Sequence, residues 1–497
     1  MRRAVILPLI VSCLAFAARV MLLTRESLWR DEVDSVRFAL EPAETLLSRL
    51  TAIGFNGPLY FLLLRGWFAL VGVNDFTLRY FSALAGVALV ALSYALGRRL
   101  FGRAAGVAAQ WITASSPLLV WYAGEGRMYA LQPALLALAM YALLRAIGPW
   151  QARRAAWWAT FVVATSLSFY VHVLSPLVLV VALVAFVALW RTARVEWRRA
   201  LVALALLTLP YLPLAAWQAP ALLAGGGTLL PAFPLDAIAS TVLRNWMLGL
   251  DAGAPLFFVP SPAARRIAQA LVLGALLSAI AVWFLQVLRR STHRRFALVL
   301  AAWAVLPTAL LSVISSLRAP LFLPRYVLWS STPFYVLLGA ACAHLQWRVA
   351  LLALCTVAHF CGLAAQVVNP IRPELRGAVA HVLREAQPGE PVVLQIGYLR
   401  HAFAYYAAQH GASPLPVRLV EAPYANESSL EAVGAQLEAQ LAGASSAWLF
   451  ESESQMWDRQ GHTRRWFETR WVLREQRLFH GVSLMRFARR AAQPTHP

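Results

Sequence analysis

Two adjacent carboxylates, Asp31 and Glu32, lie in an acidic segment, RESLWRDEVDSVRFALEPAE, of an otherwise basic chain. The pair follows soon after a hydrophobic run at residues 4–23, so we expect it near a membrane surface. A carboxylate there can act as a general base toward a hydroxyl group, or it can hold a divalent metal. The alternative is a solvated acidic loop that takes no part in chemistry.

A second group of polar residues, Glu125, Arg127 and Tyr129, lies in the segment WYAGEGRMYAL. A guanidinium beside a membrane suits bidentate binding of a phosphate. The alternative is a surface ion pair between Glu125 and Arg127, which contributes little to stability.

A third group lies in RAPLFLPRYVL, which contains Arg318, Arg325 and Tyr326. These arginines could face a phosphate, or they could extend toward lipid headgroups. His172, in SFYVHVLSP, ends another hydrophobic run and could orient a substrate. A lone histidine in such a place is more often structural.

The composition indicates which class of protein must position these residues. Of the 497 residues, 60% are hydrophobic and 13% are charged, whereas soluble domains average about 45–50% and about 25%. A soluble cytosolic enzyme, a disordered chain and a soluble nucleic-acid-binding protein are therefore excluded. The net charge of +21 comes entirely from arginine, with no lysine, and most arginines cluster between hydrophobic runs. Such clusters are typical of cytoplasmic loops rather than of nucleic-acid binding.

The hydrophobic runs predict a polytopic α-helical membrane protein with about 11 spans. The expected spans are 4–23, 77–97, 104–122, 128–147, 156–174, 175–190, 200–217, 267–288, 296–316, 326–345 and 348–368. Arg2 and Arg3 predict a cytoplasmic N-terminus, and the later dense arginine clusters then also fall inside, except Arg265-Arg266. If residues 58–73 also crossed the membrane, the arginine clusters that follow them would fall outside. We therefore expect these residues to lie on, or dip into, the outer face. We interpret residues 1–23 as an anchor rather than a cleaved signal peptide.

Two domains are expected. Residues 1–370 form the membrane module, with outer loops 24–57 and 218–266, and residues 371–497 form a small α/β domain. Its expected elements are helices at 374–386, 400–409 and 430–441 and strands at 391–396, 416–420 and 446–450. The odd number of spans predicts that this domain is extracytoplasmic, in a protein of the inner or plasma membrane.

The acidic and basic groups share the outer side of this topology, which favours a substrate with a lipid tail and a phosphate. The sequence has no glycine-rich loop of the kind that binds nucleoside triphosphates. The four cysteines, Cys13, Cys342, Cys355 and Cys361, lie in hydrophobic runs without metal-ligand spacing. We expect no metal and no other cofactor.

Several segments, in order and spacing, resemble bacterial relatives of the dolichyl-phosphate-mannose protein mannosyltransferases. These belong to the C-type (GT-C) glycosyltransferases, which include the lipid A aminoarabinose transferases. The segments are SLWRDEVDS, GPLYFLLLRGWF, FTLRYFSALAGVALVALSYALGRRLFG, SPLLVWYAGEGRMYAL, PLFLPRYVL and RPELRGAVAHVLREAQPGEPVVL. The resemblance implies transfer of a sugar from a polyprenyl-phosphate-linked donor on the outer face of the membrane, without a nucleotide sugar. The leading hypothesis is an inverting glycosyltransferase whose acceptor is a hydroxyl group on a protein, a lipid or an envelope glycan.

The resemblance also implies roles for individual residues. Asp31 matches the first-loop aspartate of the family, the general base, with Glu32 beside it. Glu125 and Arg127 match the acid and the arginine of the second loop, and Arg325 matches the arginine of a late Pro-Arg-Tyr motif. On this hypothesis Asp31 deprotonates the acceptor, while Arg127 and Arg325 stabilise the leaving phosphate.

Departures from the family pattern leave the sugar and the acceptor open. Arg30 precedes the aspartate where relatives often have an apolar residue, and Asn56-Gly57-Pro58 stands where His-Pro-Pro is usual. Gly124-Glu125-Gly126 stands in place of Gln-Glu-Ala.

Two other functions are compatible with the same features. A transporter or flippase for lipid-linked sugars would bind the same ligand, but it would need polar residues through the membrane centre, where the predicted spans have few charges. A non-catalytic envelope scaffold would work mainly through the C-terminal domain, which could alternatively hold the acceptor for an enzyme.

Overall fold

The computed structural model describes residues 2–50, 56–150, 152–213, 215–216, 233–250, 261–290, 293–317 and 320–490. The chain divides into two compact units. The first comprises Met1–Leu23, Ala39–Gly72 and Phe76–Asn369, and the second comprises Thr24–Phe38, Val73–Asp75 and Pro370–Pro497. The segment with the acidic pair therefore belongs to the same unit as the C-terminal domain.

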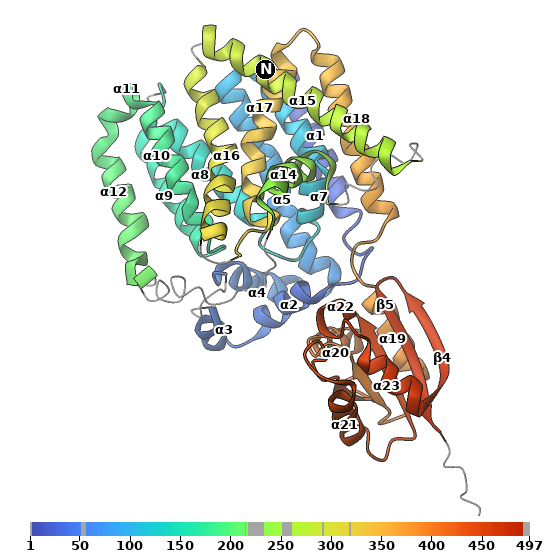
Figure 1. Ribbon diagram of the computed structural model, residues 1–497. Helices are drawn as coiled ribbons and strands as arrows, with labels where there is room; N and C mark the ends of the chain where they lie inside the picture. Colours follow the sequence, from blue (N-terminus) through green and yellow to red (C-terminus); the bar gives the residue numbers. More distant parts are fainter. Residues whose placement is uncertain are drawn as a thin grey trace, which may run out of the picture. The chain divides into compact units, whose positions relative to one another are not determined.

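The first unit is helical (Figure 1). Its α-helices are α1 (Arg2–Val20), α3 (Ala43–Leu50), α4 (Leu59–Val71), α5 (Asp75–Phe101), α6 (Arg103–Ser115), α7 (Pro117–Ala123), α8 (Leu131–Ile147), α9 (Arg154–Phe169), α10 (Val178–Ala188), α11 (Trp190–Ala193), α12 (Trp197–Thr208), α14 (Leu235–Leu248), α15 (Pro262–Arg290), α16 (Arg294–Leu317), α17 (Ser331–His344) and α18 (Arg348–Val368). Short 3-10 helices are η1 (Ser175–Leu177), η2 (Arg194–Glu196), η3 (Leu209–Tyr211) and η4 (Pro324–Ser330).

The chain is a multi-pass membrane protein. Within the described residues, five helices are long and apolar enough to cross a bilayer: Asp75–Phe101, Pro262–Arg289, Arg294–Leu317, Pro324–His344 and Arg348–Val368. A bent pair, Ser175–Ala188 and Trp190–Tyr211, would make a sixth, and α1, α4 and α8 are shorter apolar helices. The predicted count of 11 spans stays a prediction.

Some predicted spans are interrupted in the structure. The expected span 104–122 is wrong as one helix, because α6 ends at Ser115 and α7 begins at Pro117. Ser116 is extended (φ −57°, ψ 118°), and its side chain accepts from the Leu119 N–H as a cap. The expected spans 175–190 and 200–217 belong to the pair that bends by 90°.

Residues 58–73, which we expect to lie on the outer face or dip into it, contain helix α4. It has 13 residues, which at 1.5 Å per residue gives a length of about 20 Å. The hydrocarbon core is about 30 Å thick. This length favours a helix on the membrane surface or partly inserted in it.

Two buried arginines tie the N-terminal helix into the first unit. Arg19, at 1% exposure, donates to the backbone oxygens of Ala15, Thr113 and Ala114. Arg79 is fully buried and donates to the Leu23 oxygen at 2.6 Å. These bonds satisfy backbone groups at the ends of α1 and α6, so they hold both helix ends in place.

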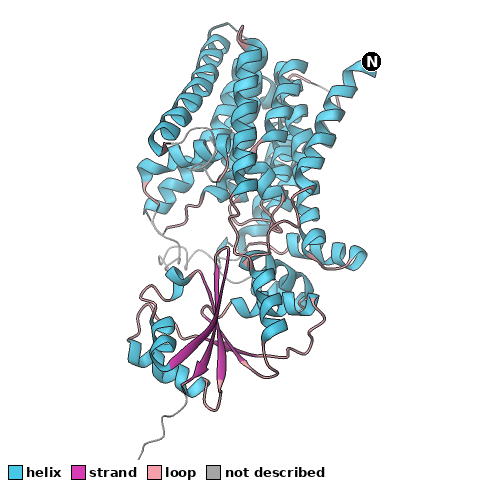
Figure 2. Cartoon of the chain, turned by 90° about the vertical axis from the view of Figure 1, so that its right-hand side faces the viewer, coloured by secondary structure: helices cyan, strands magenta, loops and turns pink. Residues whose placement is uncertain are grey.

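The second unit contains one five-stranded sheet in the order β2-β1-β3-β5-β4 (Figure 2). Its strands are β1 (Pro391–Leu394), β2 (Arg418–Glu421), β3 (Ser446–Ser452), β4 (Trp471–Phe479) and β5 (Val482–Arg489). Strand β1 pairs in parallel with β2 and β3, whereas β5 pairs antiparallel with β3 and β4. Its helices are α2 (Arg30–Leu40, through Phe38), α19 (Leu375–Glu385), α20 (Leu399–Gln409), α21 (Leu430–Gln440), α22 (Ser454–Trp457) and α23 (His462–Arg470).

The three helices and three strands predicted within residues 374–450 are confirmed as α19, β1, α20, β2, α21 and β3. Strands β4 and β5, which lengthen the sheet, were not predicted. The core that supports them contains Val393, Leu449, Trp466, Phe467 and Phe487, each at most 2% exposed.

Candidate functional site

The eight predicted site residues fall into two groups, one in each unit. Asp31 and Glu32 lie in the second unit. The other six residues, Glu125, Arg127, Tyr129, His172, Arg325 and Tyr326, lie in the first. Arg318 and most of the predicted outer loop 218–266 lie outside the described residues; the described part of that loop includes α14.

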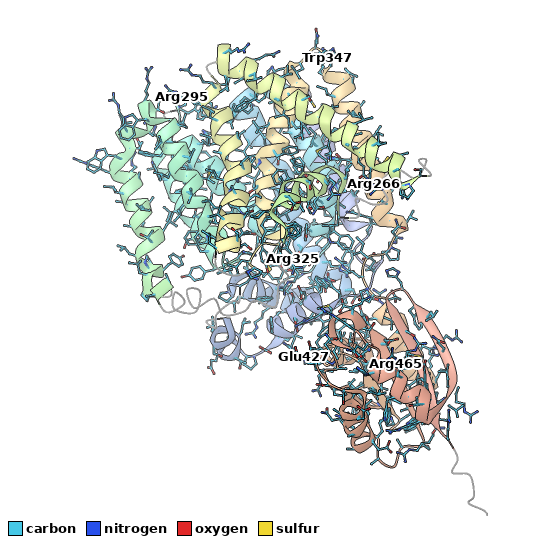
Figure 3. The ribbon with its side chains drawn as sticks, in the orientation of Figure 1. Arg266, Arg295, Arg325, Trp347, Glu427 and Arg465 are labelled. Atoms are coloured by element: carbon cyan, nitrogen blue, oxygen red, sulfur yellow. The ribbon has the colours of Figure 1, made fainter. Side chains whose placement is uncertain are left out.

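Three separate segments position the group in the first unit. The turn between α7 and α8 carries Glu125, Arg127 and Tyr129, the turn after α9 carries His172, and η4 carries Arg325 and Tyr326. Figure 3 shows Arg325 at one end of the helical unit and Arg295 and Trp347 at the opposite end. We call these six residues the arginine–tyrosine cluster.

Ring contacts join the three segments. The His172 ring packs edge-on against Tyr326, with centroids 5.2 Å apart, and lies 6.3 Å from the Tyr129 ring. The Arg325 guanidinium carbon lies 5.5 Å from the Tyr129 centroid and 5.8 Å from that of Tyr326. Arg127 lies over Phe61 at 6.0 Å. The predicted residues that are far apart in sequence therefore come together.

The surroundings of His172 define its protonation. Its side chain is 1% exposed, and Nδ1 accepts a hydrogen bond from the Leu174 N–H at 3.2 Å. Burial, with the charges of Arg127 and Arg325, lowers the pKa of His172 to about 3. The neutral ring with an accepting Nδ1 must carry its hydrogen on Nε2. Among the described residues this buried Nε2 has no hydrogen-bond partner.

Tyr129 is also held neutral. Burial raises the pKa of Tyr129 to about 12, although Arg325 and Arg127 oppose the shift. Its phenol therefore keeps its proton at physiological pH. Two guanidinium groups, a neutral imidazole and a phenol offer hydrogen-bond donors, an arrangement suited to an anion such as a phosphate.

The turn that carries Glu125 and Arg127 is closely packed. Glu125 is 2% exposed. Ser82 donates to the Arg127 oxygen at 3.1 Å, and the Tyr60 and Ser82 hydroxyls are 3.0 Å apart. A Cβ atom at Gly126 would lie 2.5–2.9 Å from three atoms of the Leu78 side chain. The absence of a side chain at this position lets the turn approach α5.

The two carboxylates of the second unit have different surroundings. Glu32 is fully buried, accepts from the Trp29 N–H at 3.4 Å and lies 3.8 Å from Arg372 Nε. It thus acts as the third-position glutamate that caps the start of α2. Asp31, one residue earlier, is half-buried. Asp31 is therefore more accessible than Glu32.

Several contacts of this segment were not predicted from the sequence. Arg372 and Arg376, at the start of the C-terminal domain, contact residues 24–32. Their chain separation from that segment exceeds any local pattern, so only the fold could identify them. Within the described ranges, no group of three or more His, Cys, Asp or Glu residues is arranged to hold a metal ion.

Part of the chain matches a known protein family by sequence. Residues 56–217 match the family described as dolichyl-phosphate-mannose-protein mannosyltransferase. No curated protein matches the chain by sequence.

Solved structures match over nearly the whole chain. ArnT from Cupriavidus metallidurans in the apo state is 16% identical, with a TM-score of 0.55, over 96% of this chain and 97% of that one. The same protein bound to undecaprenyl phosphate is 14% identical (TM-score 0.54; 96% and 97%). The oligosaccharyltransferase AglB from Archaeoglobus fulgidus, with an inhibitory peptide and a dolichol-phosphate, is 13% identical (TM-score 0.56; 94% and 71%). The chain shares the fold of these enzymes.

Proposed function

We propose that the chain is a membrane glycosyltransferase of the GT-C type, which transfers a sugar from a polyprenyl-phosphate-linked donor to a hydroxyl acceptor. The observation that carries this proposal is the arginine–tyrosine cluster, whose donors suit a phosphate. Solved proteins of the same fold bind undecaprenyl phosphate and dolichol-phosphate, which supports the same class of lipid carrier here.

The proposed donor site binds the phosphate through Arg127, Arg325 and Tyr129. His172 contributes its Nε2–H, and Tyr326 holds the imidazole by edge contact. When the bond between the anomeric carbon and the phosphate oxygen breaks, negative charge grows on the departing polyprenyl phosphate. Preorganised donors stabilise that charge most strongly where water is excluded.

The proposed general base is Asp31. It takes the proton of the acceptor hydroxyl while that oxygen bonds to the anomeric carbon from the face opposite the phosphate, which inverts the configuration. Glu125, buried and close enough to influence the Tyr129 phenol, is the second proposed catalytic carboxylate. Glu32 supports Asp31 by capping α2 rather than by touching the substrate.

The reaction is proposed to take place on the outer face of the membrane, with the N-terminus in the cytoplasm and the C-terminal domain outside. The acceptor is a hydroxyl group on a protein, a lipid or an envelope glycan. No metal is part of the proposed mechanism.

The test replaces Asp31 with asparagine and follows both sides of the reaction. We expect D31N to remain folded in the membrane and to lose transfer by at least about 100-fold, within the range for general bases. Mass spectrometry of cells should then show accumulated polyprenyl-phosphate sugar and one missing glycan. Asp34→Asn is the matched control, because Asp34 lies on the same helix and pairs with Arg37 at 3.2 Å.

Two outcomes would contradict the proposal. Wild-type transfer by D31N would remove Asp31 as the base. Movement of a lipid-linked sugar across vesicles without a new glycosidic bond would indicate a transporter.

A further inference from the structure

The first outer segment of the chain folds as part of the C-terminal domain. Residues Thr24–Phe38 and Val73–Asp75 form one compact unit with Pro370–Pro497. The contacts between them join residues 301–378 positions apart in sequence. Three sets of these contacts hold residues at the first turn of α2 or just before it. Others, such as Arg37 with His401 at 2.6 Å and Tyr405 with Asp75 at 2.8 Å, lie elsewhere.

The first set surrounds the start of α19. Arg376 donates through both terminal nitrogens to the Thr24 oxygen, each at 3.2 Å, and to Asp75 at 2.6 Å. The Ser27 hydroxyl accepts from the Arg376 N–H at 3.1 Å and so satisfies a free backbone donor of the first helical turn. The Ile371 N–H donates to the Glu26 carboxylate at 3.0 Å.

The second set is a buried charge cluster. Arg372, 8% exposed, lies 3.9 Å from Glu26 and 3.8 Å from Glu32. Glu32 is fully buried and also caps α2 through the Trp29 N–H. Removal of one partner from a buried ion pair is strongly destabilising, so the position of this turn depends strongly on Arg372.

The third set lies at the carboxyl ends of two neighbouring parallel strands. Tyr398 follows β1 and donates to Glu453, which follows β3. The Arg30 guanidinium carbon lies 4.3 Å from the Tyr398 ring centroid. Open α/β sheets commonly bind ligands at this edge, where the strand order reverses. Here the first residue of α2 contacts that edge.

We propose that the C-terminal domain serves as a holder for the first turn of α2, and that Arg372 is a positioning residue that orients Asp31 through Glu32. This inference rests on the proposed role of Asp31 as general base. It assigns the domain a function in the reaction even if the domain never touches the donor.

The test is steady-state kinetics of the full chain with the variant Arg372→Gln. We expect kcat to fall at least tenfold while the KM for the donor changes less than twofold, because the proposed donor-binding residues belong to the other unit. Glu32→Gln should behave similarly, and the double variant should lose no more than the worse single one. Arg372→Lys should recover part of kcat. The matched control is Arg384→Gln, on the exposed side of α19, where the arginine bonds its own helix at Ala380.

A pH profile separates positioning from loss of folded protein. The charged and titratable groups that face the start of α2 include Arg372, Arg376, Tyr398 and Glu453 of the C-terminal domain. Within the segment itself they include Glu26, Arg30, Glu32, Asp34 and Arg37. The Arg372→Gln change removes a positive charge 3.8 Å from Glu32, the neighbour of Asp31. Loss of a nearby positive charge disfavours ionised carboxylates, so the acidic limb of the kcat profile should move to higher pH in R372Q. A smaller amount of folded enzyme would lower the profile without moving it.

Each outcome decides the proposal. Wild-type kcat in R372Q would overturn it, as would a reduced kcat with an unmoved acidic limb. If R372Q does not accumulate, Ser27→Ala provides a milder test. We expect a reduced kcat at unchanged donor KM, and a wild-type kcat would refute the proposal that the C-terminal domain positions α2. If D31N itself retains transfer, the proposed function fails instead, whatever the Arg372 variants show.

Discussion

At the scale of single residues, the cluster is notable for a histidine that stays neutral beside two arginines. The Leu174 N–H bonds to Nδ1 and thereby selects the tautomer with hydrogen on Nε2. A positive imidazole would be repelled by Arg127 and Arg325 and would lose its hydration in the buried site. His172 therefore stays neutral at physiological pH, as its proposed role as a donor to the phosphate requires.

This role predicts a graded response to substitution. His172→Phe keeps a ring but removes the donor, and we expect kcat to fall about 100-fold, as for the loss of one donor to a developing oxyanion. His172→Gln restores an N–H donor and should lose less. Transfer kinetics with a fixed donor measure both. Equal losses for Phe and Gln would show that the ring fills space and does not donate.

The same residue predicts how stability depends on pH. The pKa of His172 is about 3 in the folded protein and about 6.5 when unfolded. As pH falls below about 6.5, His172 becomes protonated in the unfolded chain but stays neutral in the folded chain. The free energy of unfolding therefore declines by up to about 1.4 kcal/mol per pH unit, until pH reaches about 3. Thermal unfolding in detergent at pH 7 and pH 5 should show a larger decline in wild type than in His172→Asn. An equal decline in both would contradict the assignment.

The sequence identifies the acidic pair but does not separate the roles of its two members. The sequence places Asp31 and Glu32 together at the expected membrane surface, but residue type alone does not distinguish them. The capping bond to Trp29 and the proximity of Arg372 separate a buried supporting glutamate from a half-buried aspartate. The capping bond is local, but the contact with Arg372 joins residues more than 300 positions apart, and no local pattern contains it.

At the scale of elements, the close packing of the turn between α7 and α8 against α5 predicts that even a methyl group at Gly126 disturbs it. Gly126→Ala would bring Cβ within 2.5–2.9 Å of Leu78, which is fully buried and cannot move aside freely. We expect a stability loss of about 1–3 kcal/mol and reduced transfer, since Glu125 and Arg127 flank the glycine. Adding Leu78→Ala removes the clashing atoms and should recover part of the lost transfer. Unchanged kinetics for G126A alone would show that the turn tolerates displacement.

Hydropathy predicts where helices lie better than where they break. The run 104–122 is apolar on average, so the interruption at Ser116 is marked in the sequence mainly by the Ser-Pro pair. In the C-terminal domain, β4 was missed because it is an exposed edge strand, WVLREQRLF, with only its first residue buried. Its charged residues suit an edge that must avoid pairing with other chains, and they hide the alternation that usually marks a strand.

At the scale of the whole molecule, chain order is a poor guide to the division into units. Composition changes near residue 370, and the main part of the second unit begins at Pro370. That unit also takes in residues 24–38, which the sequence assigns to a loop of the membrane module. The contacts responsible are mostly backbone carbonyls and buried charges that no hydropathy pattern reports.

The arginines of the turn between α8 and α9 predict the orientation of the chain in the membrane. Arg145 and Arg153 flank the turn between α8 and α9, and clusters of this kind stay in the cytoplasm because translocation of positive charge is disfavoured. In a chain with its four cysteines replaced by alanine, Ala152→Cys should react with an impermeant maleimide only after the cells are permeabilised. Glu427→Cys, exposed in the C-terminal domain, should react in intact cells. The reverse pattern would put the domain in the cytoplasm and would exclude an acceptor on the outer face, whereas the expected pattern leaves Asp31 and its holder on the side where lipid-linked sugars are consumed.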